Sequence, residues 1–113
     1  MSYITYTDDE INIVEKGIEE VRKVLMGEDR GKKRSLLFCL DWYLDPYYGN
    51  KLPYRDELVA LLQLVVVKEK DKDVIWDVVD LLREYTYGPY EILEHDFEQI
   101  LEAMKPFVKE LMS

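Results

Sequence analysis

A repeat with a period of 39 residues is the feature that most constrains how this chain can fold. Shifting the sequence by this interval places the apolar positions of 36–43 on those of 75–82, and those of 57–65 on those of 96–104. In each copy the apolar residues recur every three or four positions, which is the spacing of one face of an α-helix. Two helices repeated at a period of about 40 residues are typical of HEAT-type helical repeats.

The repeat predicts an all-α fold of five or six helices, arranged as two stacked hairpins of a HEAT-like repeat behind an N-terminal capping helix. We expect one helical domain over residues 1–113. Within it, the periodicity predicts the capping helix over 8–26, the first hairpin over 35–67 and the second hairpin over 74–111.

Local signals refine these helices. Thr7 followed by Glu10 is a capping box that starts the first helix, and the polar segment 27–34 reads as a connector. Trp76 stands among apolar neighbours and is expected in the core. Pro106 lies inside the last apolar stretch, which begins near residue 95, so it should kink that helix or split it in two.

Six of the nine tyrosines lie in or beside two breaks, at 45–50 and 84–91. If the hairpins stack, their loops project from one edge, so the two breaks should lie together as an aromatic strip. Tyrosine gives stiff, amphipathic contact area and is enriched at binding hot spots, although Tyr54 and Tyr90 are expected to pack between the hairpins. The candidate partner-binding residues are Asp45, Tyr47, Tyr48, Glu84, Tyr85, Tyr87, Tyr90, Glu91 and Glu94.

The formal net charge of −9 restricts the class of partner. An acidic surface repels phosphate backbones, so we expect no direct contact with nucleic acid. The same surface attracts basic proteins, although negative charge also suits a protein that only has to stay soluble. The start of the chain does not resemble a signal peptide and no apolar run is long enough for a membrane span. With one cysteine, Cys39, these features predict a cytoplasmic protein.

Catalytic signatures are weak. The sequence has no Gly-rich phosphate loop, no nucleophile elbow and no Cys/His ligand cluster, so we expect no catalytic residue, no metal and no cofactor. Asp41 and Asp80 occupy equivalent repeat positions and could form an acid–base pair in a cleft. His95 is the one histidine, and we expect it to be an ordinary surface residue.

The stretches LDWYLDPYYG (40–49) and LLREYTYGPYEILEHDFEQI (81–100) carry a resemblance to a known class of proteins. A short, acidic, HEAT-like helical domain with such loops resembles the immunity proteins of bacterial polymorphic or contact-dependent toxin systems. This resemblance implies a tight, neutralising complex with a basic toxin domain, often a nuclease. Tyr47-Tyr48 is also similar to the Tyr-Tyr pair of helical colicin-nuclease immunity proteins, but the length, repeat and helix order differ, so their mode of inhibition is not carried over.

The leading hypothesis is therefore a protein-binding inhibitor that blocks its partner by steric and electrostatic occlusion. One alternative is an acidic mimic of nucleic acid that inhibits a DNA-binding protein, which predicts phosphate-like carboxylate spacing and few aromatic anchors. The other is a small helical scaffold or ligand-binding protein, which a deep polar cavity between the hairpins would favour.

Overall fold

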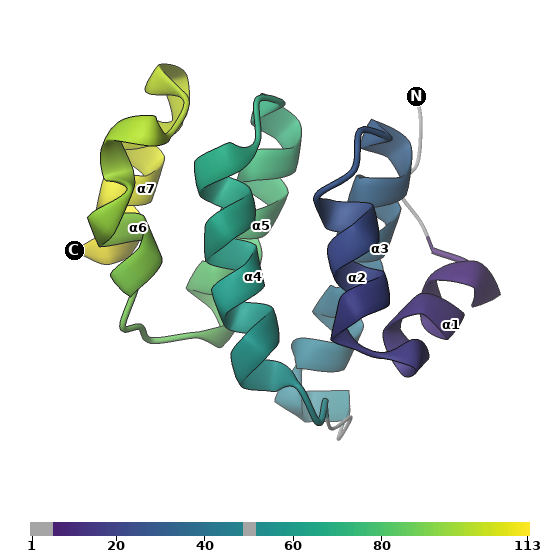
Figure 1. Ribbon diagram of the computed structural model, residues 1–113. Helices are drawn as coiled ribbons and strands as arrows, with labels where there is room; N and C mark the ends of the chain where they lie inside the picture. Colours follow the sequence, from purple (N-terminus) through teal and green to yellow (C-terminus); the bar gives the residue numbers. More distant parts are fainter. Residues whose placement is uncertain (1–5, 49–51) are drawn as a thin grey trace. The chain divides into compact units, whose positions relative to one another are not determined.

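The computed structural model describes residues 6–48 and 52–113, and every regular element in these ranges is helical (Figure 1). This confirms the all-α fold. Instead of five or six helices, the described residues form seven α-helices and three short 3-10 turns. The chain divides into two compact units, an N-terminal unit of residues 1–55 and a C-terminal unit of residues 56–113.

The N-terminal unit consists of α1 (Asp8–Lys16), α2 (Ile18–Leu25) and α3 (Arg30–Leu44), and each of these helices contacts the other two. Its core forms because each helix turns an apolar face inward. The buried apolar residues of these three helices are Val14, Val21, Leu25, Leu36, Leu37, Cys39, Leu40 and Leu44.

The single helix expected over 8–26 is interrupted at Gly17. This glycine has φ 121°, a backbone conformation that L side chains rarely adopt. Its N–H donates to the carbonyl of Val14 at 3.3 Å, which ends α1, and its own carbonyl accepts from Val21 at 3.3 Å in the first turn of α2. One glycine thus converts the predicted capping helix into two helices.

The start of α3 also differs from the expectation, because residues 30–34 are helical and not part of a connector. Asp29 caps this helix: its Oδ1 accepts from the N–H of Lys32 at 3.0 Å. At the start of α1, Thr7 Oγ1 accepts from the N–H of Asp9 at 3.2 Å and donates to the Glu10 carboxylate at 3.0 Å, so the predicted helix start is confirmed.

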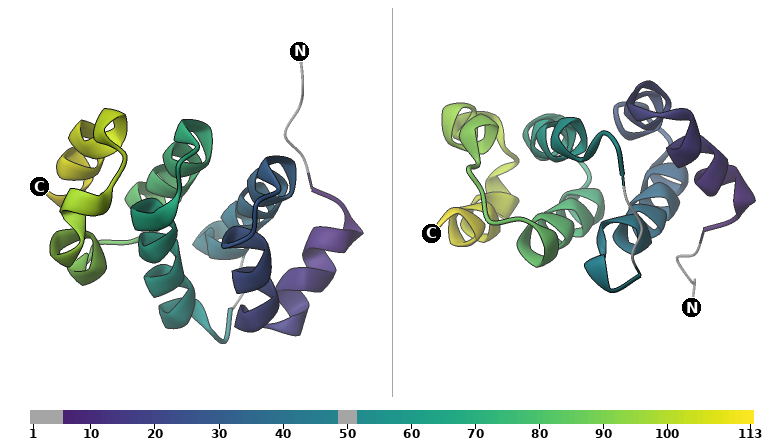
Figure 2. Two further views of the ribbon diagram at one scale, coloured as in Figure 1. Left: turned by 45° about the horizontal axis from the view of Figure 1, so that its top comes forward. Right: turned by 90° about the horizontal axis from the view of Figure 1, so that it is seen from below.

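The C-terminal unit consists of α4 (Arg55–Lys68), α5 (Lys72–Tyr85), α6 (Glu91–His95) and α7 (Lys105–Met112). The first residue of α4, Arg55, is the last residue of the N-terminal unit. In this unit α4 lies beside α5, and α6 lies beside α7 (Figures 1 and 2). The turn between α4 and α5 has only three residues, 69–71, and Asp71 caps α5 by accepting from two N–H groups.

The expected hairpin over 35–67 joins the helices now labelled α3 and α4, which belong to different units, so that hairpin stays a prediction. A short turn makes the helices on either side of it antiparallel neighbours, so α4 pairs with α5.

The last apolar stretch is not one helix. Between α6 and α7 the chain makes two 3-10 turns, η2 (Phe97–Gln99) and η3 (Glu102–Met104). Pro106 is the second residue of α7, where a missing N–H costs nothing, so the expected split falls just before the proline. Residues 57–65 and 96–104, which the repeat aligned, therefore differ in conformation.

Candidate functional site

The first tyrosine break begins at the end of α3, where Asp45 Oδ1 accepts from the N–H of Tyr47 at 2.8 Å. The Tyr47 side chain is 95% exposed. Tyr54 is buried instead, and its hydroxyl donates to the carbonyl of Val14 in α1 at 2.6 Å. The Tyr48 side chain and residues 49–51 lie outside the described part of the structure.

The second break is a loop of residues 86–90 that folds around the ring of Tyr90. Gly88 has φ 89° and is followed by a cis peptide bond to Pro89. The Tyr90 ring is buried, and its hydroxyl lies 3.1 Å from Thr86 Oγ1 and donates to the Thr86 carbonyl at 3.3 Å. Thr86 Oγ1 also donates to the carbonyl of Leu82 at 2.5 Å, which joins the loop to the end of α5. Tyr90 packs inward and supports the loop, while its expected place between the hairpins stays a prediction.

Gln63 of α4 holds the far end of this loop. Its side chain is buried, its Nε2 donates to the Pro89 carbonyl at 3.5 Å, and its Oε1 accepts from the N–H groups of Ile92 at 3.2 Å and Leu93 at 3.5 Å. The N-cap residue of α6, Tyr90, makes no side-chain cap of its own. Gln63 thus caps α6 from a neighbouring helix, a role that sequence reasoning missed because local capping patterns do not show it.

Tyr87 is held at the tip of this fixed loop with its side chain 101% exposed. A surface pocket of about 430 Å³ opens beside it. Tyr87 and Tyr90 from the loop, Glu94 from α6, and Glu110 and Leu111 from α7 are among the residues that line it. We call Tyr87 and this pocket the Tyr87 site.

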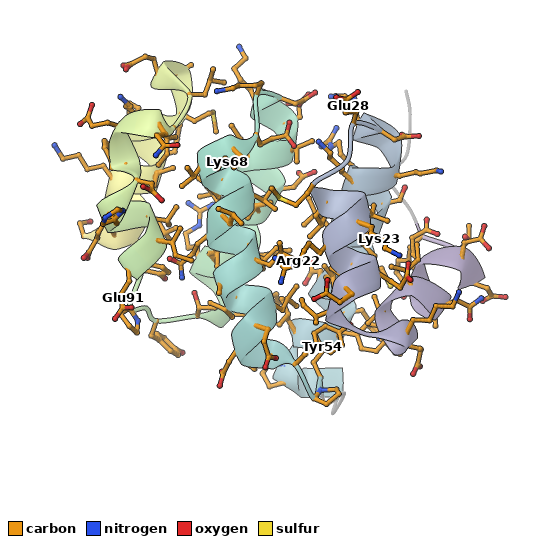
Figure 3. The ribbon with its side chains drawn as sticks, in the orientation of Figure 1. Arg22, Lys23, Glu28, Tyr54, Lys68 and Glu91 are labelled. Atoms are coloured by element: carbon orange, nitrogen blue, oxygen red, sulfur yellow. The ribbon has the colours of Figure 1, made fainter. Side chains whose placement is uncertain are left out.

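Carboxylates lie at and near the Tyr87 site, where Glu94 and Glu110 line the pocket. Glu84 at the end of α5, Glu91 and Glu94 are exposed, and Glu91 lies at the start of α6, where the chain enters that helix from the loop (Figure 3). Arg83 also lines the pocket, but its guanidinium is ion-paired with Asp80. The local field therefore favours a positively charged ligand. Tyr85, on the same stretch, is half-buried.

The structure thus brings Tyr85, Tyr87, Tyr90, Glu91 and Glu94 together with Glu84 in the C-terminal unit. Asp45 and Tyr47 belong to the N-terminal unit, so a single strip made from both breaks stays a prediction.

Trp76 is not a core residue, contrary to the sequence expectation. It is 39% exposed and packs edge-on against Phe107 of α7, with ring centroids 5.1 Å apart. The signal was present in the sequence, because Asp80 and Arg83 follow Trp76 at positions i+4 and i+7 on the same helical face. A face with this polar spacing points to solvent.

The groups considered for catalysis have other surroundings. Asp41 and Asp80 belong to different units, and His95 is exposed, with Nδ1 3.0 Å from Asp96 Oδ1. Burial, together with the charge of Glu10, raises the pKa of the Cys39 thiol to about 11. Cys39 is therefore protonated at neutral pH and is a weak nucleophile. Within residues 6–48 and 52–113, no three side chains are grouped as ligands for a metal ion.

Comparisons with protein-family models, curated proteins and solved structures found no match for this chain. Among the helices that the structure describes, none has the length and apolar character needed to cross a membrane.

Proposed function

We propose that this chain is a protein-binding inhibitor: a cytoplasmic immunity protein with a HEAT-like repeat, which occludes a basic partner, a bacterial toxin domain, and has no catalytic activity of its own. The observation that carries the proposal is the contrast within one loop. Tyr90 and Gln63, whose side chains are buried, fix the loop through hydrogen bonds, while Tyr87 is fully exposed at its tip.

A fixed loop with an exposed aromatic ring suits binding, because little conformational entropy remains to be lost when a partner covers the ring. The Tyr87 side chain contributes almost nothing to the core at an exposed fraction of 101%. Its contact area is therefore free for a partner. Glu94 lines the pocket at this site, and the exposed Glu84 and Glu91 flank the loop in the sequence, so these carboxylates favour a partner with lysine or arginine at its surface.

The HEAT-like part of the proposal is supported by α3 and α5, which the repeat aligns. The aligned positions Leu36 and Ile75 are both buried, as are Cys39 and Val78. Each helix is followed by a tyrosine-containing break. Both helices thus turn these two pairs of positions inward and lead into the proposed contact loops, although at another aligned pair Leu37 is buried and Trp76 is exposed.

The test is a titration of the purified chain into the toxin domain encoded by the neighbouring open reading frame. Tyr87→Ala should weaken binding by about 1–3 kcal/mol, the range of interface hot spots, and leave the melting temperature almost unchanged. Tyr90→Phe is the control in the same loop: it removes a buried hydroxyl, so it should lower stability by about 1 kcal/mol and change affinity little.

Absence of binding to any protein encoded beside it would contradict the immunity proposal. Unchanged affinity in Tyr87→Ala, measured against a partner that does bind, would contradict the role of the Tyr87 site.

A further inference from the structure

An exposed aromatic pair lies on α5 and α7 of the C-terminal unit, outside the residues assigned above to partner binding. Trp76 and Phe107 meet at an interplanar angle of 87°, and they are 39% and 42% exposed. The two helices that carry them are in contact and lie side by side in the ribbon views (Figure 2). The rings are therefore held in place on one side and open to solvent on the other.

Arg83 connects this pair to the Tyr87 site. Its guanidinium carbon lies 5.4 Å from the centroid of the Trp76 ring, and the group is also ion-paired with Asp80. Arg83 lines the pocket beside Tyr87 as well. Trp76, Asp80 and Arg83 thus form one exposed stripe along α5 that leads from the aromatic pair to the pocket. We call the surface of Trp76, Phe107 and Arg83 the aromatic platform.

Exposed carboxylates lie toward the pocket end of the platform, whereas Lys72 is exposed at the other end of the α5 stripe. Asp80 is exposed, and its negative charge is paired with the positive charge of Arg83. Glu84 on α5 and Glu110 on α7 are also exposed, and Glu110 lines the pocket. A second copy of this acidic chain would bring like charges together here, which is unfavourable. The complementary occupant is basic.

We infer that the aromatic platform is a contact surface for a segment of a partner protein that presents an apolar side chain between basic residues. The apolar side chain packs on the exposed faces of Trp76 and Phe107, and the basic side chains meet Glu84 and Glu110. Tryptophan and arginine are among the residue types enriched in binding hot spots. This inference depends on the proposed function in one respect, which is that the partner is a protein.

The experiment uses short peptides as probes, followed by two-dimensional NMR of the nitrogen-labelled full chain. The chain has two tryptophans, so the indole N–H of Trp76 reports on the platform and that of Trp42, in the N-terminal unit, is an internal control. Acetyl-Arg-Leu-Arg-amide should shift the Trp76 signal saturably and leave that of Trp42 unchanged. Acetyl-Arg-Gly-Arg-amide should bind about tenfold more weakly, since it buries no leucine, and acetyl-Glu-Leu-Glu-amide should cause no saturable shift.

Variants separate the platform from the rest of the surface. Phe107→Ala should abolish the saturable shift, whereas Phe38→Ala, which removes a similarly exposed ring (47%) from the N-terminal unit, should not change it. Glu110→Lys should also abolish it while leaving the packing of Trp76 and Phe107 intact, so the test does not depend on Phe107→Ala folding.

Equal binding of all three peptides, or equal shifts at both tryptophans, would overturn the inference. Self-association of the chain that Phe107→Ala abolishes, measured by sedimentation equilibrium, would also overturn it. A shift at Trp76 that Tyr87→Ala leaves unchanged would support the platform, even if the Tyr87 site failed its own test.

Discussion

At the scale of single residues, burial decides which chemistry each side chain of this protein can perform. Tyr54 and Tyr43 both have pKa values raised to about 12, and in each case burial is the largest cause. The charge of Glu15 adds to both shifts, and its carboxylate also accepts a hydrogen bond from the Tyr43 hydroxyl at 3.3 Å. The pKa of the Cys39 thiol is raised by burial in the same way. These residues stabilise the N-terminal unit in their protonated forms.

We expect this burial to appear as a loss of stability in alkali. The pKa of Cys39 rises from 9.0 to about 11 on folding, so between these values the unfolded chain binds fewer protons than the folded chain. The free energy of unfolding should therefore be at its full value below pH 9 and fall as pH rises through about 11. Urea unfolding from about pH 8 to about pH 10.5 measures this slope.

Cys39→Val is the control, because it keeps an apolar side chain and removes the ionisable group. Its free energy of unfolding should fall less between about pH 9 and about pH 10.5, because the contribution of the thiol is removed, whereas Tyr43 and Tyr54, whose ordinary pKa of 10.0 lies inside this window, contribute in both proteins. Equal slopes for the two proteins would show that the thiol does not contribute.

At the scale of helices, single residues decide where each element begins and ends. Gly17 separates α1 from α2 with φ 121°. Gly31 instead lies inside α3, and a Cβ placed there would meet only Asp29 Oδ1, at an ordinary 3.5 Å. The two glycines therefore have opposite consequences for stability.

Gly17→Ala should destabilise the protein by about 1–3 kcal/mol, because alanine is strained at this backbone conformation. Gly31→Ala should stabilise it by about 0.5–1 kcal/mol, because alanine loses less entropy in a helix. Thermal or urea unfolding of the two variants tests this, and the same sign for both changes would contradict the assigned roles.

Gln63 should be a strong determinant of the α6 start. Gln63→Leu leaves the N–H groups of Ile92 and Leu93 without their acceptor, so we expect a loss of about 1–3 kcal/mol and faster hydrogen exchange at these two amides. Gln99→Leu is the matched control, because Gln99 is exposed, and it should change stability by less than about 0.5 kcal/mol. Unchanged exchange at Ile92 in Gln63→Leu would show that the cap is not needed.

At the scale of the whole molecule, charge acts over longer distances than any contact. The formal net charge is −9, which should raise the association rate with a basic partner. Charge beside the Tyr87 site should matter more than the same charge elsewhere, because the field near the contact surface guides the final approach.

Glu84→Lys should slow association roughly two- to tenfold at low salt, and the defect should shrink as salt screens the charges. Glu28→Lys makes the same change of two charge units, from −9 to −7, in the turn between α2 and α3 (Figure 3). It should slow association much less. Stopped-flow mixing with the partner measures both rates, and equal defects would mean that only net charge matters.

Much of the secondary structure follows from local sequence. The Thr7 cap predicts the start of α1, the apolar spacing predicts α4, and Pro106 predicts a split in the last apolar stretch. The structure has all three features. These predictions succeed because capping and periodicity depend on residues within one or two turns. Gly17 was missed for the opposite reason: one glycine in an otherwise periodic stretch is compatible with an unbroken helix.

The sequence by itself determined that this chain is helical, acidic and rich in tyrosine at two breaks. Only the tertiary structure decided which side chains face solvent. Tyr87 is exposed while Tyr90, three residues later, is buried, and Trp76 leaves the core to pack on Phe107. The start of α6 depends on Gln63, 29 residues before Ile92. The physical reason is that periodicity describes one helix at a time, whereas exposure and distant capping depend on which helices pack together.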